Sequence, residues 1–193
     1  MTGRRVVALA GGVGAARFLD GLARVVAPNR LFIVGNTGDD AEIHGLHVSP
    51  DLDTVTYTLA GLADRRRGWG LRGDSFRCLE ALARLGAPAW FQLGDRDLAT
   101  HLFRTERLRN GETLAEVTAA IAAALGVQAA IVPMTNERVR TMVCTPRGEL
   151  EFQRYFVERG ARDRVAGLRF AGADDARPAP GVLEAIEEAE AIV

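Results

Sequence analysis

Four short clusters of glycines and carboxylates contain most of the residues in this sequence that could carry out chemistry. The first is a glycine-rich turn, Gly11-Gly12-Val13-Gly14, which is followed by Arg17 in the first turn of a predicted helix. The backbone N–H groups of such a turn can face an anion, and an arginine beside them suits phosphate. The third glycine of the dinucleotide fingerprint is missing, and the chain contains no lysine for a P-loop. The turn therefore predicts phosphate binding, with a tight turn that binds no ligand as the alternative.

Two acidic clusters follow. Asn36-Thr37-Gly38-Asp39-Asp40 comes directly after the apolar run 31–34, at the carboxyl end of a predicted strand, where open α/β sheets bind their ligands. Its adjacent carboxylates repel each other unless a cation or a ribose hydroxyl compensates. Asp51, Asp53 and Thr54 stand at a helix N-terminus and supply more oxygen atoms than a cap requires, which suits Mg²⁺. An exposed Asx turn and simple helix capping are the respective alternatives.

The fourth cluster is Gly94-Asp95-Arg96-Asp97, followed by His101 on the same predicted helix. It repeats the order of strand end, glycine and acids at a helix start, with the run 90–93 as the strand. A local ion-pair network is the alternative, and His101 lies four residues after Asp97, so the two can pair along the helix.

Arg65-Arg66-Arg67 precedes Gly68-Trp69-Gly70 and forms a fifth feature. Arginines can bind phosphates and Trp69 can stack on a planar ring. The alternative is that this run of arginines only forms a solvent-exposed surface. No nucleophile–base pair accompanies these clusters. Together they favour phosphoryl-type transfer governed by a metal and by positioning over covalent acyl transfer.

The elements that must position these clusters alternate as in a parallel sheet. The apolar run 5–10 predicts a buried strand, a helix follows the glycine turn, and 31–34 predicts a second strand. We therefore expect a Rossmann-like three-layer α/β sandwich with a mainly parallel sheet. Further helices are predicted at 55–62, at 76–85 with Asp74-Ser75 as its cap, at 95–104, from Thr113 to 125 and at 182–190, and further strands at 127–132 and 191–193.

The domain organisation is predicted to be simple. Residues 1–193 form one domain, with a small hairpin or insert region at 137–180 whose turn lies at Pro146-Arg147-Gly148. Because a parallel strand needs neighbours and the last predicted strand ends the sequence, we expect a chain truncated at its C-terminus.

Composition narrows the class of protein. The 193 residues are 48% hydrophobic and 25% charged with a formal net charge of −1, so neither nucleic acid nor an anionic membrane is an expected partner. Two cysteines fit a reducing compartment, and the uncharged stretch 117–134 is too diluted by small and polar residues for a membrane span. We predict a cytoplasmic protein.

At these clusters the sequence resembles the 2-phospho-L-lactate transferase family of coenzyme F420 biosynthesis, including its phosphoenolpyruvate-type members. The resemblance covers essentially the whole chain, and the motif from Gly94 to His101 is its most specific part. The other matching segments are Gly11–Gly14 with Arg17-Phe18-Leu19, Gly38-Asp39-Asp40 with Ile43-His44-Gly45-Leu46, Pro50–Thr54, Gly68-Trp69-Gly70, Arg104-Thr105 and Phe152-Gln153.

The resemblance implies an Mg²⁺-dependent enzyme that moves a phospholactyl or phosphoenolpyruvyl group from a guanosine-diphospho donor onto the deazaflavin Fo and releases GMP. It places the glycine loop at the diphosphate, and Thr54 and Arg96 near the acceptor. We expect Asp51, Asp53 and Asp95 to be catalytic and Asp39, Asp40 and Asp53 to hold the metal. Ligand binding is expected at Gly11, Gly12, Gly14, Arg17, Asn36, Thr54, Trp69, Arg96 and His101.

Three points stay open at this stage. The sequence does not choose between lactyl and enolpyruvyl donors, and a homodimer is only expected. A nucleotide or nucleotide-sugar binding regulator of the gluconeogenesis-factor type is the alternative function, but it would not need Asp95, Asp97 and His101. An inactive scaffold that dimerises through an exposed sheet edge is a third hypothesis.

Overall fold

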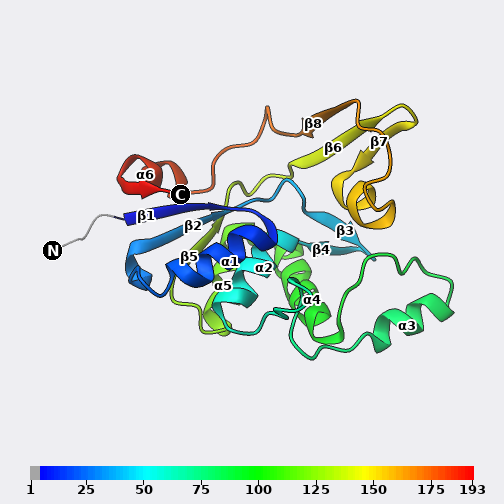
Figure 1. The fold of residues 1–193 in the computed structure, drawn as a ribbon, viewed down its shortest axis with the longest axis horizontal. Helices are drawn as coiled ribbons and strands as arrows, with labels where there is room; N and C mark the ends of the chain where they lie inside the picture. Colours follow the sequence, from blue (N-terminus) through cyan, green and yellow to red (C-terminus); the bar gives the residue numbers. More distant parts are fainter. Residues whose placement is uncertain (1–4) are drawn as a thin grey trace.

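A four-stranded parallel sheet forms the centre of the computed structural model, which describes residues 5–193 (Figure 1). The strand order is β5-β2-β1-β9, and each neighbouring pair is parallel. The strands are β1 (Arg5–Ala10), β2 (Leu31–Gly35), β5 (Ala130–Pro133) and β9 (Ala189–Ile192). This arrangement confirms the predicted parallel α/β fold.

Helices cover both faces of this sheet and complete three layers. One face carries α1 (Gly12–Leu22), α2 (Pro50–Leu59) and α5 (Leu114–Ala124), and α6 (Val182–Glu187) lies on the other (Figure 1). Helix α5 begins at the predicted capping box, in which the Thr113 side chain and Glu116 satisfy each other's backbone N–H groups.

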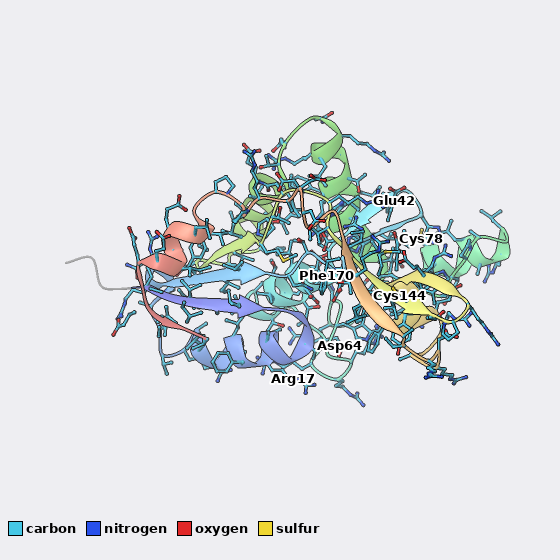
Figure 2. The ribbon with its side chains drawn as sticks, turned by 90° about the horizontal axis from the view of Figure 1, so that it is seen from above. Arg17, Glu42, Asp64, Cys78, Cys144 and Phe170 are labelled. Carbon is cyan, nitrogen blue, oxygen red and sulfur yellow. The ribbon has the colours of Figure 1, made fainter. Side chains whose placement is uncertain are left out.

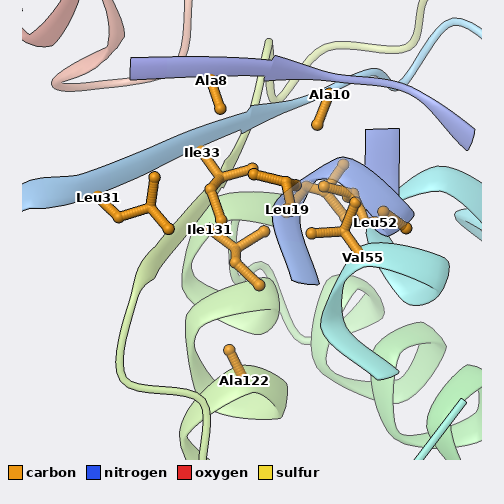
Figure 3. Close-up of a cluster of buried hydrophobic side chains, with 11 residues drawn as sticks. Ala8, Ala10, Leu19, Leu31, Ile33, Leu52, Val55, Ala122 and Ile131 are labelled. Atoms are coloured by element: carbon orange, nitrogen blue, oxygen red, sulfur yellow. The ribbon is translucent and has the colours of Figure 1, made fainter. Parts of the chain in front are cut away.

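The alternation of side chains along the strands explains why the strand sequences are almost wholly apolar. Ala8 and Ala10 of β1 and Ile33 of β2 point toward the helices α1 and α2 (Figure 3). Their neighbours Val7 and Val34 point to the opposite face and pack with α6. Since both faces are buried, each strand needs a continuous apolar run, and the hydrophobic effect holds the layers together.

A second body of strands stands beyond the carboxyl ends of β1 and β2 (Figure 1). The predicted hairpin is observed as β6 and β7, and a third strand joins it to give the antiparallel order β7-β6-β8. A separate short hairpin, β3–β4, was not predicted, nor was β8, because strands of three to five residues give little periodicity. These elements are β3 (Ala41–Ile43), β4 (Leu46–Val48), β6 (Arg140–Thr145), β7 (Gly148–Glu151) and β8 (Gly167–Ala171), and a short helical segment η2 (Arg154–Glu158) follows β7.

The segment before α4 (Asp95–Arg109) differs from the prediction. Residues 90–93 are not a strand: they pack with Ala41, Ile43 and Val48 of the β3–β4 hairpin in a small apolar cluster. Their apolar run is therefore explained by burial against a hairpin and not by pairing in a sheet. Helix α3 (Arg77–Arg84) lies on the far side of this segment, at the end of the molecule (Figure 1).

The described helices do not include a membrane span. Each helix within residues 5–193 is too short or too polar to cross a bilayer.

Candidate active-site cleft

A cleft of about 950 Å³ opens where β1 and β2 end and the second body of strands begins. It collects side chains from six separate stretches of sequence, from the glycine turn to the η2 segment. Of the predicted site residues it contains Gly11, Gly12, Asn36, Asp39, Asp51, Asp53, Thr54, Trp69 and His101.

The glycine turn forms one end of the cleft. Gly12 begins α1 with a φ of +67°, which an L side chain rarely adopts, and a Cβ on Gly11 would lie 3.3 Å from Asp51 Oδ2. The backbone N–H of Gly12 donates to the Asp51 carboxylate. Glycine is therefore required here because the turn and the carboxylate approach each other closely.

Asp51 and Asp39 face this end of the cleft without a cationic partner among the ion pairs of residues 5–193. Asp51 accepts a hydrogen bond of 2.8 Å from Asn36 Nδ2. Burial raises the pKa of Asp51 to about 6, and repulsion from Asp39 adds to this effect. Burial likewise raises the pKa of Asp39, while a hydrogen bond from Thr141 opposes the shift. Two carboxylates that destabilise each other's charge would both gain from a bound cation.

Asp40, predicted as a metal ligand, does not line the cleft. Its carboxylate is buried, and Oδ2 lies 2.9 Å from His47 Nε2 and accepts from the Ser49 hydroxyl at 2.8 Å. Burial raises the pKa of Asp40, although these partners oppose the shift. Asp39 lines the cleft, so the turn separates the surroundings of the two neighbouring carboxylates.

Asp53, predicted to be catalytic and a metal ligand, lines the cleft and forms an ion pair within the protein. Both of its carboxylate oxygens accept from the Arg104 guanidinium, with Nη1 at 3.1 Å from Oδ2. Arg104 is only 1% exposed, and although burial opposes its charge, Asp53 raises its pKa. Such a fork-to-carboxylate pair fixes α2 to α4. No group of three or more His, Cys, Asp or Glu side chains within 5–193 forms a metal site.

His101 continues this buried network toward the cleft. Arg104 Nη1 lies 3.2 Å from His101 Nδ1, and because a guanidinium can only donate, Nδ1 accepts and the ring proton stands on Nε2. Nε2 lies 3.3 Å from Asp97 Oδ1, which also accepts from the Tyr57 hydroxyl at 2.7 Å. Burial would raise the pKa of Asp97, but its contacts with His101 and Tyr57 outweigh burial and lower it. Asp97 is thus held ionised on the cleft wall.

Asp95, predicted to be catalytic, lies outside the cleft lining. Its carboxylate caps the neighbouring helix α3, where it accepts from the Ser75 hydroxyl at 2.7 Å and from the backbone N–H of Cys78 at 3.0 Å. These donors, the Ser75 hydroxyl first, lower the pKa of Asp95. Arg96 also lies outside and donates to the carbonyl oxygen of Arg72 at 3.3 Å.

Asp74 reciprocates this arrangement. It was predicted to cap α3, but its carboxylate accepts from the backbone N–H groups of Arg96 at 3.0 Å and Asp97 at 3.1 Å, and so caps α4. A side chain on Gly94 would overlap the Asp74 carboxylate. Asp95, at the start of α4, therefore caps α3, and Asp74, which precedes α3, caps α4. Gly94 leaves room for the Asp74 carboxylate.

Aromatic rings form a large part of the cleft lining. Arg67 stands over the ring of Trp69 at 5.6 Å and over the ring of Phe76 at 4.9 Å, which fixes the loop after α2. Phe152 and Phe156 are stacked with centroids 5.5 Å apart. The rings that line the cleft are Tyr57, Trp69, Trp90, Phe91, Phe152 and Phe156.

Gly14 and Arg17 fall outside the lining. Figure 2 shows Arg17 on α1 and Asp64 on the loop after α2, and the Arg17 guanidinium lies near Gly68 of this loop. The residues that sequence reasoning missed are mainly the apolar and aromatic ones from the 90–93 run and from 152–157. Only the density of aromatic residues in these stretches could have indicated them.

The fold and the cleft define a Rossmann-like α/β protein with its cleft at the carboxyl ends of the parallel strands. The chain belongs to the 2-phospho-L-lactate transferase CofD family, whose model matches residues 6–193. A phosphoenolpyruvate transferase of Streptomyces griseus is 45% identical over 98% of this chain and 61% of its own length. A 2-phospho-L-lactate transferase of Methanopyrus kandleri is 40% identical with the same coverage. The chain thus spans about three fifths of the curated relatives that it matches.

A solved structure supports the fold independently. A member of the UPF0052 family from Bacillus halodurans superposes with a TM-score of 0.62 over 100% of this chain and 58% of its own, at 17% sequence identity. This similarity confirms the arrangement of the layers and strands.

Proposed function

We propose that this chain provides the catalytic cleft of an enzyme of coenzyme F420 biosynthesis, which transfers a phospholactyl or phosphoenolpyruvyl group from a guanosine-diphospho donor to Fo. The observation that carries the proposal is a single cleft lined by a glycine turn, by two carboxylates that form no ion pair within residues 5–193, and by aromatic rings. The names of the relatives supply the type of reaction.

The transfer is a displacement at phosphorus. A ribityl hydroxyl oxygen of Fo bonds to the phosphorus that carries the lactyl or enolpyruvyl group. The bond from that phosphorus to the bridging oxygen of the diphosphate breaks, and GMP leaves with its electron pair. The hydroxyl proton passes to a carboxylate of the cleft. Such a reaction depends mainly on positioning and on stabilisation of charge at the phosphoryl oxygens.

Mg²⁺ fits Asp39 and Asp51. Mg²⁺ in phosphate-handling sites usually has one or two carboxylates, several waters and the substrate phosphates as ligands. Asp39 and Asp51 provide two carboxylates, and both line the cleft. Burial raises the pKa of each, so a bound cation would stabilise their ionised forms. When bound, the ion would neutralise charge on the diphosphate and the leaving GMP.

The other cleft residues bind and orient the two substrates. The backbone of Gly11 and Gly12 at the start of α1 faces the diphosphate. Asp97, held ionised, accepts a hydrogen bond from a hydroxyl of the acceptor, and Thr54 lies on the same wall. The aromatic rings that line the cleft provide flat apolar surfaces for a deazaflavin.

The test is a transfer assay with the purified chain, Fo, the guanosine donor and Mg²⁺. We expect GMP to be released in equal amount to the Fo consumed, with no release when Fo is omitted, and quenching of tryptophan fluorescence by Fo. Nucleotide binding with no GMP release and no response to Fo would contradict the transferase and favour a nucleotide-binding regulator. A cytoplasmic homodimer stays a prediction, which sedimentation and fractionation can check.

A further inference from the structure

Asp39 is held by residues from the second body of strands, more than 100 positions later in the sequence. The Thr141 backbone N–H on β6 donates to the carbonyl oxygen of Gly38 at 2.6 Å, and the Thr141 hydroxyl lies against this turn, where it favours the ionised form of the Asp39 carboxylate. Gln153 Nε2, in the segment after β7, donates to the backbone carbonyl oxygen of Asp39 at 3.1 Å. The turn that carries Asp39 is therefore held from β6 and from the segment that follows β7.

The loop that carries Asp39 supplies one restraint of its own. Asn36 Oδ1 accepts from the backbone N–H of Gly38 at 3.0 Å, which shapes the turn before Asp39, and the Asn36 side chain also counteracts the raised pKa of Asp39. Thr141 Oγ1 would lie 3.0 Å from a Cβ on Gly38, so β6 sits directly against the turn. The glycine permits this approach, which brings the Thr141 hydroxyl next to Asp39.

Gln153 is well placed for a second restraint. It is 8% exposed, lines the cleft next to Phe152, and donates from its side-chain amide to the backbone carbonyl oxygen of Asp39. This hydrogen bond compensates the burial of the amide and joins segments 114 positions apart, and its loss would leave the Asp39 carbonyl oxygen without this donor.

We propose that Thr141 and Gln153 are positioning residues, which orient the Asp39 carboxylate beside Asp51 so that the pair can hold a divalent cation. The inference rests on the proposed function, because that function places the cation at Asp39 and Asp51. It adds a role for β6 and for the segment after β7: the segment that supplies the rings of Phe152 and Phe156 also contacts the backbone of Asp39 through Gln153.

A purely structural role predicts a different result from a positioning role. If these contacts only attach the sheet to the main body, their loss should lower thermal stability and leave cation affinity unchanged. If they position Asp39, affinity should fall more than stability, and a substitution that keeps the hydroxyl should rescue it.

The experiment is an electron paramagnetic resonance titration of the chain with Mn²⁺, a paramagnetic substitute for Mg²⁺, with the melting temperature of each variant measured alongside. Thr141→Val keeps the shape of the side chain and removes the hydroxyl, and Gln153→Met removes the amide. We expect each to weaken Mn²⁺ binding about tenfold, which is the scale of one hydrogen bond to a charged or buried group. Thr141→Ser should stay within about twofold of the parent chain.

Thr145→Val is the matched control. Thr145 is on the same strand, loses the same hydroxyl, and bonds only within its own hairpin, to the carbonyl oxygen of Gly148 and the N–H of Arg147. Equal Mn²⁺ affinity in the parent, Thr141→Val and Gln153→Met would overturn the positioning role and leave the proposed function intact. An equal loss in Thr145→Val would also overturn it. A parent chain that binds no Mn²⁺ would contradict the cation site and this inference together. If Thr141→Val does not fold, the Mn²⁺ affinity of Gln153→Met tests the positioning role.

Discussion

The cleft and the α3–α4 region both contain aspartates in turns or at helix starts, yet the partners of the two sets differ. In the cleft, Asp39 and Asp51 have raised pKa values because burial outweighs their hydrogen bonds. In the α3–α4 region, Asp95 is satisfied by a hydroxyl and backbone N–H groups, and its pKa is lowered. Asp53, which bonds Arg104 of α4, belongs with the satisfied set.

The difference indicates which carboxylates could bind a cation. A carboxylate whose charge is balanced by its own fold contributes to stability and gains little from a cation, although it can still accept from a substrate hydroxyl, as we propose for Asp97. A carboxylate buried beside another one, with no counter-ion among residues 5–193, lowers stability, and a bound cation would offset this loss. Aspartates in similar short motifs are thus distinguished by their partners and not by their residue types.

Arg104→Met should have the largest effect on stability, because it leaves Asp53 buried with no counter-ion. We expect a loss of about 3–5 kcal/mol in the free energy of unfolding, measured by urea denaturation. The double variant Arg104→Met/Asp53→Leu should recover part of this loss, since no charge then remains buried. A single variant as stable as the parent would show that Asp53 does not need its neutralising partner.

Asp51→Asn should have the largest effect on cation binding. Removal of one of two carboxylates should weaken Mn²⁺ affinity by about 100-fold or more, with no loss of melting temperature, because an unfavourable buried charge is also removed. Asp53→Asn is a poor control since it breaks the Arg104 pair, so Asp95→Asn is preferred and should change Mn²⁺ affinity less than about twofold. Equal losses in Asp51→Asn and Asp95→Asn would remove the distinction between the two sets.

The pH dependence of stability should show the same distinction without any cation. The pKa of Asp51 is about 6 in the folded chain, above its ordinary value of 3.8, so the folded state holds more protons between these values. The free energy of unfolding should therefore fall as pH rises from about 4 to about 6, by about 1–3 kcal/mol from this residue. The difference between the parent and Asp51→Asn isolates the contribution, and a difference that is flat with pH would contradict it.

Asp95→Ala should have the smallest effect. It removes the acceptor for the Ser75 hydroxyl and the N–H of Cys78, so α3 should fray and exchange its first amide hydrogens faster. The melting temperature should fall less than in Arg104→Met, and Mn²⁺ affinity should stay within about twofold of the parent. Loss of transfer activity with α3 unchanged would restore a catalytic role for Asp95.

Short-range patterns predicted the main sheet well. The apolar runs that became β1 and β2 are buried on both faces, and this demand is visible in the residues themselves. The capping box at Thr113 is also local, because its hydrogen bonds join residues three positions apart. The 90–93 run was misread because apolarity alone does not say whether a segment pairs in a sheet or packs on a hairpin.

The sequence by itself determined the order of strands and helices, the glycine turn, and the set of carboxylates from which the cleft is built. Only the tertiary structure decided which of those carboxylates are open to a ligand. The reason is physical: the charge state of a buried acid depends on the groups within a few ångströms of it. These come from distant segments, as Arg104 reaches Asp53 across 51 positions and Gln153 reaches Asp39 across 114.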